Sequence, residues 1–251
     1  MSVVLILGSA PNATLARDWP RAVFDRIVVI NNAHRLRPDW DAHIFPWDFP
    51  SEGLPPLAPG QVRVEEGDFV PAQNAYGGFV YGGGTMAFTA GYWALHALRP
   101  RVLAFMGCDM HYPAGGRTHF YGTGTADPLR EDVTLRSLEA KSARLMLLAA
   151  RQGCAAVNLS DGPSRLVLPR AGLTGLDRQR PAAHDPAACA AALVREASLG
   201  YFVPSGRYWQ EAGRFDPAQI DALDALWLAA SQERPNPLEH PQGGQTARGR
   251  A

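Results

Sequence analysis

Residues 3–12 read VVLILGSAPN, a run of five apolar residues that stops at a turn of small residues. A short apolar run of this kind is typical of a strand buried on both faces of a parallel sheet. Gly8 and Pro11 break the strand, so Ser9 and Asn12 follow its carboxyl end. Because ligands of doubly wound α/β folds bind at the carboxyl ends of strands, the stretch predicts a binding site at this turn.

Short apolar runs alternate with helical patterns along the first 160 residues. We expect strands over residues 3–7, 27–30, 43–45, 62–64, 102–106 and 155–159, and helices over 85–98 and 133–151. Such alternation predicts an α/β fold with a Rossmann-like, mostly parallel sheet and helices on both faces.

The pattern changes near residue 160, and the rest of the chain has two helical patterns, over 186–199 and 217–230. We therefore expect a Rossmann-like domain over 1–160, a helical extension or lid over 161–234, and a disordered tail over 235–251.

The composition is that of a globular protein without overall charge. Of 251 residues, 46% are hydrophobic, and 24 basic residues balance 24 acidic ones, which argues against nucleic acid as a partner. Cys108, Cys154 and Cys189 show no CxxC spacing, so free thiols are expected. No apolar run reaches the ~18 residues of a membrane span. We expect a cytoplasmic protein; a peripheral position at the inner membrane and a homo-oligomer are left open.

The first turn is expected to lead into a helix. Gly8 permits a tight turn, Ser9 offers a hydroxyl, and Asn12 or Thr14 can cap the helix, whose first N–H groups suit a phosphate. The turn lacks the GxGxxG pattern, which disfavours NAD.

Two amides end the second strand. The side chains of Asn31 and Asn32 can donate and accept hydrogen bonds to a ribose or a base edge. A polar cluster over residues 43–48 follows the third strand and continues into a Pro-rich connection that reaches residue 60. Loops of this length are more often functional than spacers.

Three glycines, Gly82, Gly83 and Gly84, precede the helix expected from Thr85. Because glycines contribute little packing, their expected use is close approach of the backbone to an anion at the helix N-terminus, with the Thr85 hydroxyl as donor. No Gly-Lys-Ser/Thr follows, which disfavours a P-loop kinase or ATPase.

The densest group of reactive side chains follows the strand that ends at Met106 and Gly107. The loop carries Asp109, His111, Tyr112, Arg117, His119 and Tyr121. These residue types serve in acid–base catalysis and in phosphate contacts. In the alternative interpretation the aspartate caps a turn, the tyrosines pack and the histidines are solvated. The spacing of the histidines matches no strong metal motif, so no bound metal is expected.

In its order of motifs the chain resembles the bacterial sialyltransferases of glycosyltransferase family 42. The motifs are LILGSAPN, INNAH, YGGGTMAFTAGYWAL, RVLAFMGCDMHY, HFYGTGT and AAVNLS, within residues 3–160. The chain is also similar to a broader Rossmann-type group that includes archaeal pterin pyrophosphokinases.

The resemblance to the sialyltransferases implies roles for individual residues. The nucleotide side would comprise Ser9, Asn32, Gly83, Gly84 and Asp109. Tyr112 and Tyr121 would contact the leaving phosphate. Two positions depart from the family: Ser9 stands where the family tends to have Asn, and the position of the family's base falls on or beside Thr123. His119 or His111 would then be the base, with Arg117 on the phosphate.

These observations predict a metal-independent glycosyltransferase that uses a CMP-activated sugar as co-substrate, a glycan as acceptor and no cofactor. One alternative is a Mg²⁺-dependent pyrophosphokinase or other phosphotransferase, in which Asp109 with Asp127 or Asp132 would hold the ion. The other is a nucleotide-binding protein without catalytic activity.

Overall fold

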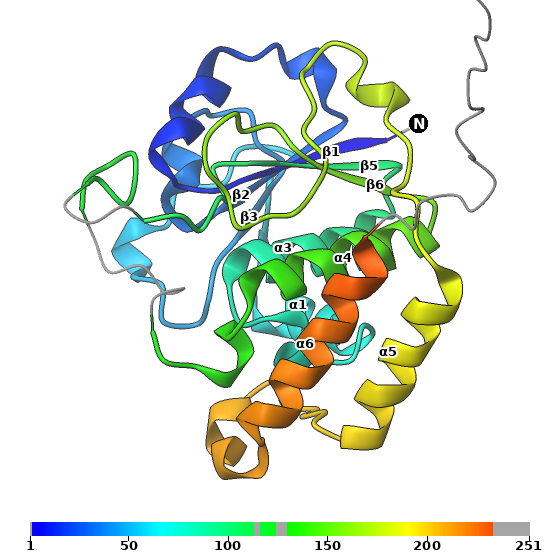
Figure 1. Cartoon of the computed structure of the whole chain (residues 1–251). Helices are drawn as coiled ribbons and strands as arrows, with labels where there is room; N and C mark the ends of the chain where they lie inside the picture. The colour runs from blue at the N-terminus through cyan, green and yellow to red at the C-terminus, as the bar shows by residue number, and fades with distance from the viewer. Residues whose placement is uncertain (1, 113–115, 124–129, 233–251) are drawn as a thin grey trace, which may run out of the picture.

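Six strands form one all-parallel sheet in the order β4-β3-β2-β1-β5-β6 (Figure 1). The computed structural model describes residues 2–112, 116–123 and 130–232. The strands are β1 (Val3–Leu7), β2 (Arg26–Ile30), β3 (Ala42–Ile44), β4 (Val62–Val64), β5 (Val102–Met106) and β6 (Ala155–Asn158). All six predicted strands are confirmed, with bounds that shift by at most one residue.

The sheet is buried on both faces, as the apolar strands predict. Val4 and Ile6 of β1 belong to one hydrophobic cluster, whereas Val3, Leu5 and Leu7 belong to a second cluster on the opposite face. The first face is covered by α1 (Glu66–Asn74), α2 (Phe79–Gly82), α3 (Met86–Trp93) and α4 (Leu138–Arg151) (Figure 1).

The second face carries short 3-10 helices and loops in place of long α-helices. The 3-10 helices are η1 (Pro11–Asp18), η2 (Arg21–Val23), η3 (Asn31–Arg35) and η8 (Leu176–Arg178), with η4 (Ser51–Gly53) in the connection from β3 to β4. Ala13, Ala33 and Leu176 anchor this layer in the second cluster. The predicted α/β Rossmann-like fold is confirmed.

The helix after the first turn differs from its prediction. It is the 3-10 helix η1, it begins after Ala10, and no side chain caps it. Asn12 and Thr14 therefore lie inside the helix, and the prediction that one of them is its cap was wrong. Four of the eight residues of η1 (PNATLARD) are Ala, Leu or Arg, which favour an α-helix, so composition does not explain its 3-10 form.

Two other helices show why their bounds differ from the periodic patterns. The predicted helix 85–98 is α3 followed by a π-helical turn, Ala94–Leu98. The predicted helix 133–151 is divided into η7 (Val133–Leu135) and α4. Asp132 caps η7 and Ser137 caps α4, so a second cap starts a new helix.

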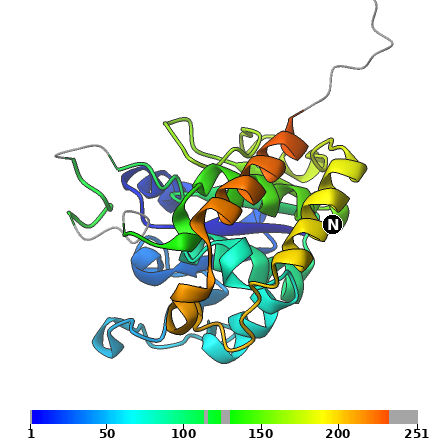
Figure 2. The ribbon, with the colours of Figure 1, turned by 60° about the horizontal axis from the view of Figure 1, so that its bottom comes forward.

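Residues beyond 160 pack against the residues that precede them. The helices α5 (Pro186–Leu199) and α6 (Pro217–Ser231) pack outside α4, and η9 (Tyr208–Arg214) connects them (Figure 2). The first hydrophobic cluster contains residues from both sides of the predicted boundary at 160, and two buried ion pairs join α4 to the last helices. The tail predicted over 235–251 lies outside the described residues. None of the described helices has the length and apolar character needed to span a membrane.

Candidate functional site

The strand order changes direction between β1 and β5. Strands β2, β3 and β4 follow one another on one side of β1, and β5 and β6 lie on its other side. Such a switch point leaves a crevice at the carboxyl ends of the strands. A cavity of about 200 Å³, which we call the switch-point cavity, lies there. Its lining includes Gly8, Ser9, Asn31, Thr85, Met86, Gly107, Cys108, Met110, Tyr112, Thr118, His119 and Tyr121. The turns after β1, β2 and β5 and the start of α3 therefore meet at one edge of the sheet.

The floor of this cavity requires glycine at two positions. The N–H of Gly8 donates to the carbonyl of Met106 at 2.8 Å, and the N–H of Ala10 donates to that of Gly107 at 3.0 Å. A Cβ on Gly8 would overlap the carbonyl of Gly107 and lie 2.7 Å from Sγ of Cys108. Gly107 itself has a left-handed φ of 69°. A side chain at either glycine would therefore push apart the turns after β1 and β5.

Asn31 is held at the cavity by two imidazoles. Its backbone is left-handed, with φ of 49°, and its carbonyl accepts hydrogen bonds from Nδ1 of His34 at 2.9 Å and Nε2 of His43 at 2.8 Å. Burial lowers the pKa of His43 to about 4, so its ring is neutral at pH 7. The side-chain Oδ1 of Asn31 is buried and has no hydrogen-bond partner in the structure. That the Asn31 amide binds a ligand stays a prediction; Asn32 does not line the cavity.

The glycine run before α3 is closely packed at two of its three positions. A Cβ on Gly83 would lie 2.7 Å from the ring of Phe88, and one on Gly82 would overlap the amide of Gln73. These two glycines therefore permit tight packing, and the predicted approach of an anion to the run stays a prediction. Gly84 lines a neighbouring cavity. Thr85 lines the switch-point cavity and caps α3, because its hydroxyl accepts from the N–H of Phe88 at 3.4 Å.

Three of the predicted catalytic side chains converge on the switch-point cavity: Tyr112, His119 and Tyr121. The rings of His119 and Tyr121 stack with centroids 4.9 Å apart, and the Tyr112 ring lies 6.5 Å from His119. Thr118 Oγ1 lies 2.9 Å from Nδ1 of His119. Burial lowers the pKa of His119, which keeps the imidazole neutral and able to accept a proton at pH 7.

Four other predicted residues do not line this cavity. His111 and Arg117 are exposed. Asp109 is buried, and its carboxylate accepts from Nδ2 of Asn12 at 2.7 Å and from Nδ2 of Asn158 at 3.2 Å. Asp109 and Asn12 thus tie the turn after β5 to the turn after β1, a role that local sequence patterns do not reveal.

Two carboxylates of the phosphotransfer alternative, Asp109 and Asp132, take part in different hydrogen-bond networks. Asp109 lies in the buried amide network, whereas Asp132 accepts from the hydroxyl of Tyr208 at 2.7 Å and from the N–H of Thr134 at 2.7 Å. Burial raises the pKa of Asp132, but the hydrogen bonds from Tyr208 and Thr134 outweigh this effect and lower the pKa overall. Asp127 lies outside the described residues. Within the described part of the chain, no three His, Cys, Asp or Glu side chains are grouped so that they could hold a metal ion.

Met110, Cys108 and Thr118 also line the cavity, although no sequence motif predicts this. Met110 has a left-handed φ of 51°, a strained conformation for a non-glycine residue that no sequence pattern announces. Burial raises the pKa of the Cys108 thiol, so this thiol is not a nucleophile at pH 7.

The fold and the cavity define a class: an α/β protein with a cavity at the switch point of a parallel sheet. Comparisons of the chain with protein-family models, with curated proteins and with solved structures gave no significant match. The function must therefore be argued from the residues of the cavity.

Proposed function

We propose that the chain is a metal-independent glycosyltransferase that moves a sugar from a CMP-activated donor to a hydroxyl group of a glycan. The observation that carries the proposal is the convergence of Tyr112, His119 and Tyr121 on a switch-point cavity beside the start of α3. Doubly wound proteins bind nucleotides at such crevices. The resemblance of the motif order to the family 42 sialyltransferases supports CMP as the nucleotide.

In the proposed reaction the acceptor oxygen attacks the anomeric carbon of the donor. The bond from that carbon to the phosphate oxygen breaks, and CMP leaves with the electron pair. His119 takes the proton of the acceptor hydroxyl, for which its neutral imidazole is suited. The phenols of Tyr112 and Tyr121 donate to the phosphate as its charge grows, and the N–H groups of Met86 and Ala87 at the start of α3 add to this stabilisation.

The first test measures binding in EDTA. A ligand that binds only the folded state raises its melting temperature, so CMP should raise it without a divalent ion, and more than UDP or ATP. Sugar transfer from a CMP-sugar should continue in excess EDTA. Loss of activity in EDTA that Mg²⁺ restores would reject the proposal in favour of phosphotransfer. CMP binding without turnover on any glycan would favour the non-catalytic alternative.

The second test separates catalysis from binding. Tyr112→Phe and Tyr121→Phe should lower kcat more than they change KM for the donor, because their hydrogen bonds strengthen in the transition state. Tyr76→Phe is the matched control, since Tyr76 does not line the switch-point cavity. Equal losses in all three variants would contradict the assigned roles.

A further inference from the structure

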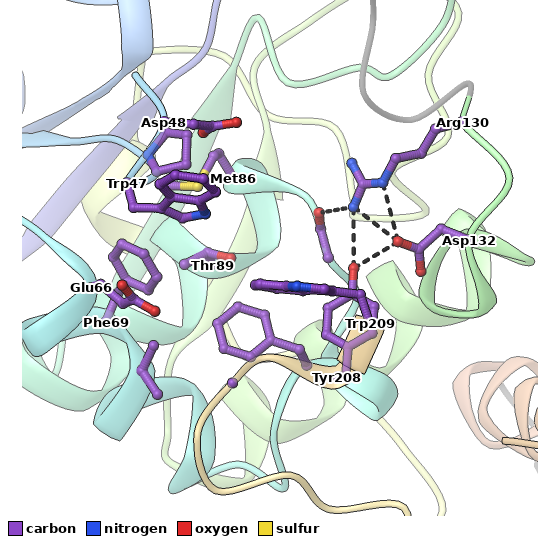
Figure 3. Close-up of a pocket in the computed structure, with 15 residues that line it drawn as sticks. Trp47, Asp48, Glu66, Phe69, Met86, Thr89, Arg130, Asp132, Tyr208 and Trp209 are labelled. Carbon is purple, nitrogen blue, oxygen red and sulfur yellow. Dashed lines mark hydrogen bonds and ion pairs between the residues drawn. The ribbon is translucent and has the colours of Figure 1, made fainter. Parts of the chain in front are cut away.

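A second and larger cavity lies beside the first. Its volume is about 370 Å³, and its lining comes from the connection after β3, from α1 and α3, and from the connection between α5 and α6 (Figure 3). Met86 lines both cavities, and Gly84 of the second directly precedes Thr85 of the first. A molecule in the second cavity would therefore lie next to whatever occupies the first. Because two tryptophans line it, we call it the tryptophan cavity.

The two tryptophans expose far more surface than packing requires. Trp47 is 73% exposed and Trp209 is 51% exposed, and Phe69, Phe79 and Tyr208 add further rings to the lining. In Figure 3 the two indoles border the cavity from different segments, with Thr89 between them in this view. Exposed aromatic surface gathered in a cavity marks a binding site. An indole face matches the apolar C–H face of a pyranose ring.

The polar groups of the tryptophan cavity select against a negative charge. Asp48, Glu66 and Asp132 bring three carboxylates, of which Glu66 pairs with Arg207 outside the lining at 3.7 Å, and among the described lining residues Arg130 is the single basic side chain. Its guanidinium donates to Asp132 at 3.1 Å, to the Gly84 carbonyl at 3.1 Å and to the Tyr208 hydroxyl at 3.2 Å (Figure 3). The remaining acceptors and the Thr89 hydroxyl suit the hydroxyl groups of a neutral sugar.

We propose that the tryptophan cavity binds a neutral pyranose ring, stacked on Trp47 or Trp209, and that it excludes sugars that carry a carboxylate. That this sugar is the acceptor rests on the proposed function, but the binding itself does not. The role of acceptor follows from position, since Met86 separates the two cavities and a hydroxyl beside it would face the donor.

The test uses saturation-transfer NMR with methyl β-galactopyranoside and methyl β-glucopyranoside as neutral probes and methyl β-glucuronide as the anionic probe. At least one neutral glycoside should bind the wild-type chain, and the glucuronide should bind about tenfold more weakly or not at all. Trp47→Ala and Trp209→Ala should each weaken the neutral glycoside about tenfold or more. Phe202→Ala is the control, since Phe202 is an exposed aromatic residue (39%) outside both linings.

The charge is tested separately with Asp48→Asn combined with Glu66→Gln, which should bring glucuronide binding to within about threefold of the neutral probe. CMP binding, measured in every variant, should change less than about twofold, which also shows that the variant folds. The proposal would be overturned if neither neutral glycoside binds, or if the tryptophan variants bind the neutral glycoside as tightly as the wild type does. Binding of cytidine in place of a sugar would also overturn it. If the wild-type chain binds a neutral glycoside but does not bind CMP, the proposed function is refuted and the sugar site remains supported.

Discussion

Replacement of Glu196 by Gln should destabilise the chain far more than the same replacement of Glu139. Both carboxylates accept two hydrogen bonds from one arginine, from Arg144 at 2.7 and 2.8 Å and from Arg165 at 2.8 and 2.9 Å. The pairs differ in burial: the side chains of Arg144 and Glu196 are 1% and 6% exposed, and those of Arg165 and Glu139 are 35% and 38% exposed. The comparison therefore varies burial at nearly constant geometry.

The expected magnitudes follow from this burial. Breaking a buried pair leaves one charge without its partner and costs about 3–5 kcal/mol, whereas an exposed pair contributes about 0–1 kcal/mol. Glu196 also accepts from Nε1 of Trp227 at 2.8 Å, so the single amide oxygen of Gln would face three N–H donors. For a chain of this size the melting temperature should fall by about 6–20 °C for Glu196→Gln and by at most about 4 °C for Glu139→Gln.

Urea unfolding followed by circular dichroism gives both free energies, provided that the m-value is unchanged. A further variant, Arg144→Met with Glu196→Leu, should recover part of the loss because it removes both buried charges. If the two Gln variants differ by less than about 1 kcal/mol, burial does not set the strength of these pairs and the argument is refuted.

Three further predictions concern the core and the switch-point cavity. Gly8→Ala should cost about 1–3 kcal/mol in unfolding free energy and weaken nucleotide binding, while Gly67→Ala, where a Cβ meets nothing within 4 Å, should cost nothing; similar losses in the two would contradict the close approach at Gly8. Because burial lowers the pKa of His43 from 6.5 to about 4, the unfolded chain binds the proton first, so stability should fall by about 3 kcal/mol as the pH drops through this range. Urea titrations at several pH values should show that the free energy of unfolding of His43→Gln depends less on pH than that of the wild type. The same pH dependence in both would contradict the role of His43. Burial raises the pKa of Cys154 to about 12 and also raises that of Cys108, so both thiols should resist Ellman's reagent until urea unfolds the chain, and fast reaction of the native protein would count against their burial.

The strands and the edge of the sheet could be predicted because their signals are local. Apolar runs such as residues 102–106 have the composition of buried strands, and each stops at a glycine or polar turn. The helix α1 was not predicted because Pro71 lies inside it, although the Glu65 and Asp68 capping box that starts it is visible in the sequence.

The role of Asp109 shows why parts of the candidate site could not be predicted from the sequence. Its partners Asn12 and Asn158 are far from it in the chain, so only the parallel pairing of β1, β5 and β6 brings the three side chains together. The tryptophan cavity could not be predicted for the same reason. Trp47 and Trp209 belong to segments whose neighbourhood depends on how α5 and α6 pack on α4.

The position of the last two helices in the sequence also determines when α4 acquires its ion-pair partners during synthesis. When a ribosome has released the whole sheet and α4, the partners of Lys141 and Arg144, which are Asp224 and Glu196, have still to emerge. Until then α4 presents two cationic groups within a large apolar surface, the kind of intermediate on which chaperones act. α6 packs on α4, α5 packs on α6, and Trp209 lies in the connection between these last two helices. Nascent chains stalled before α6 should therefore remain sensitive to protease long after their sheet sequence is complete.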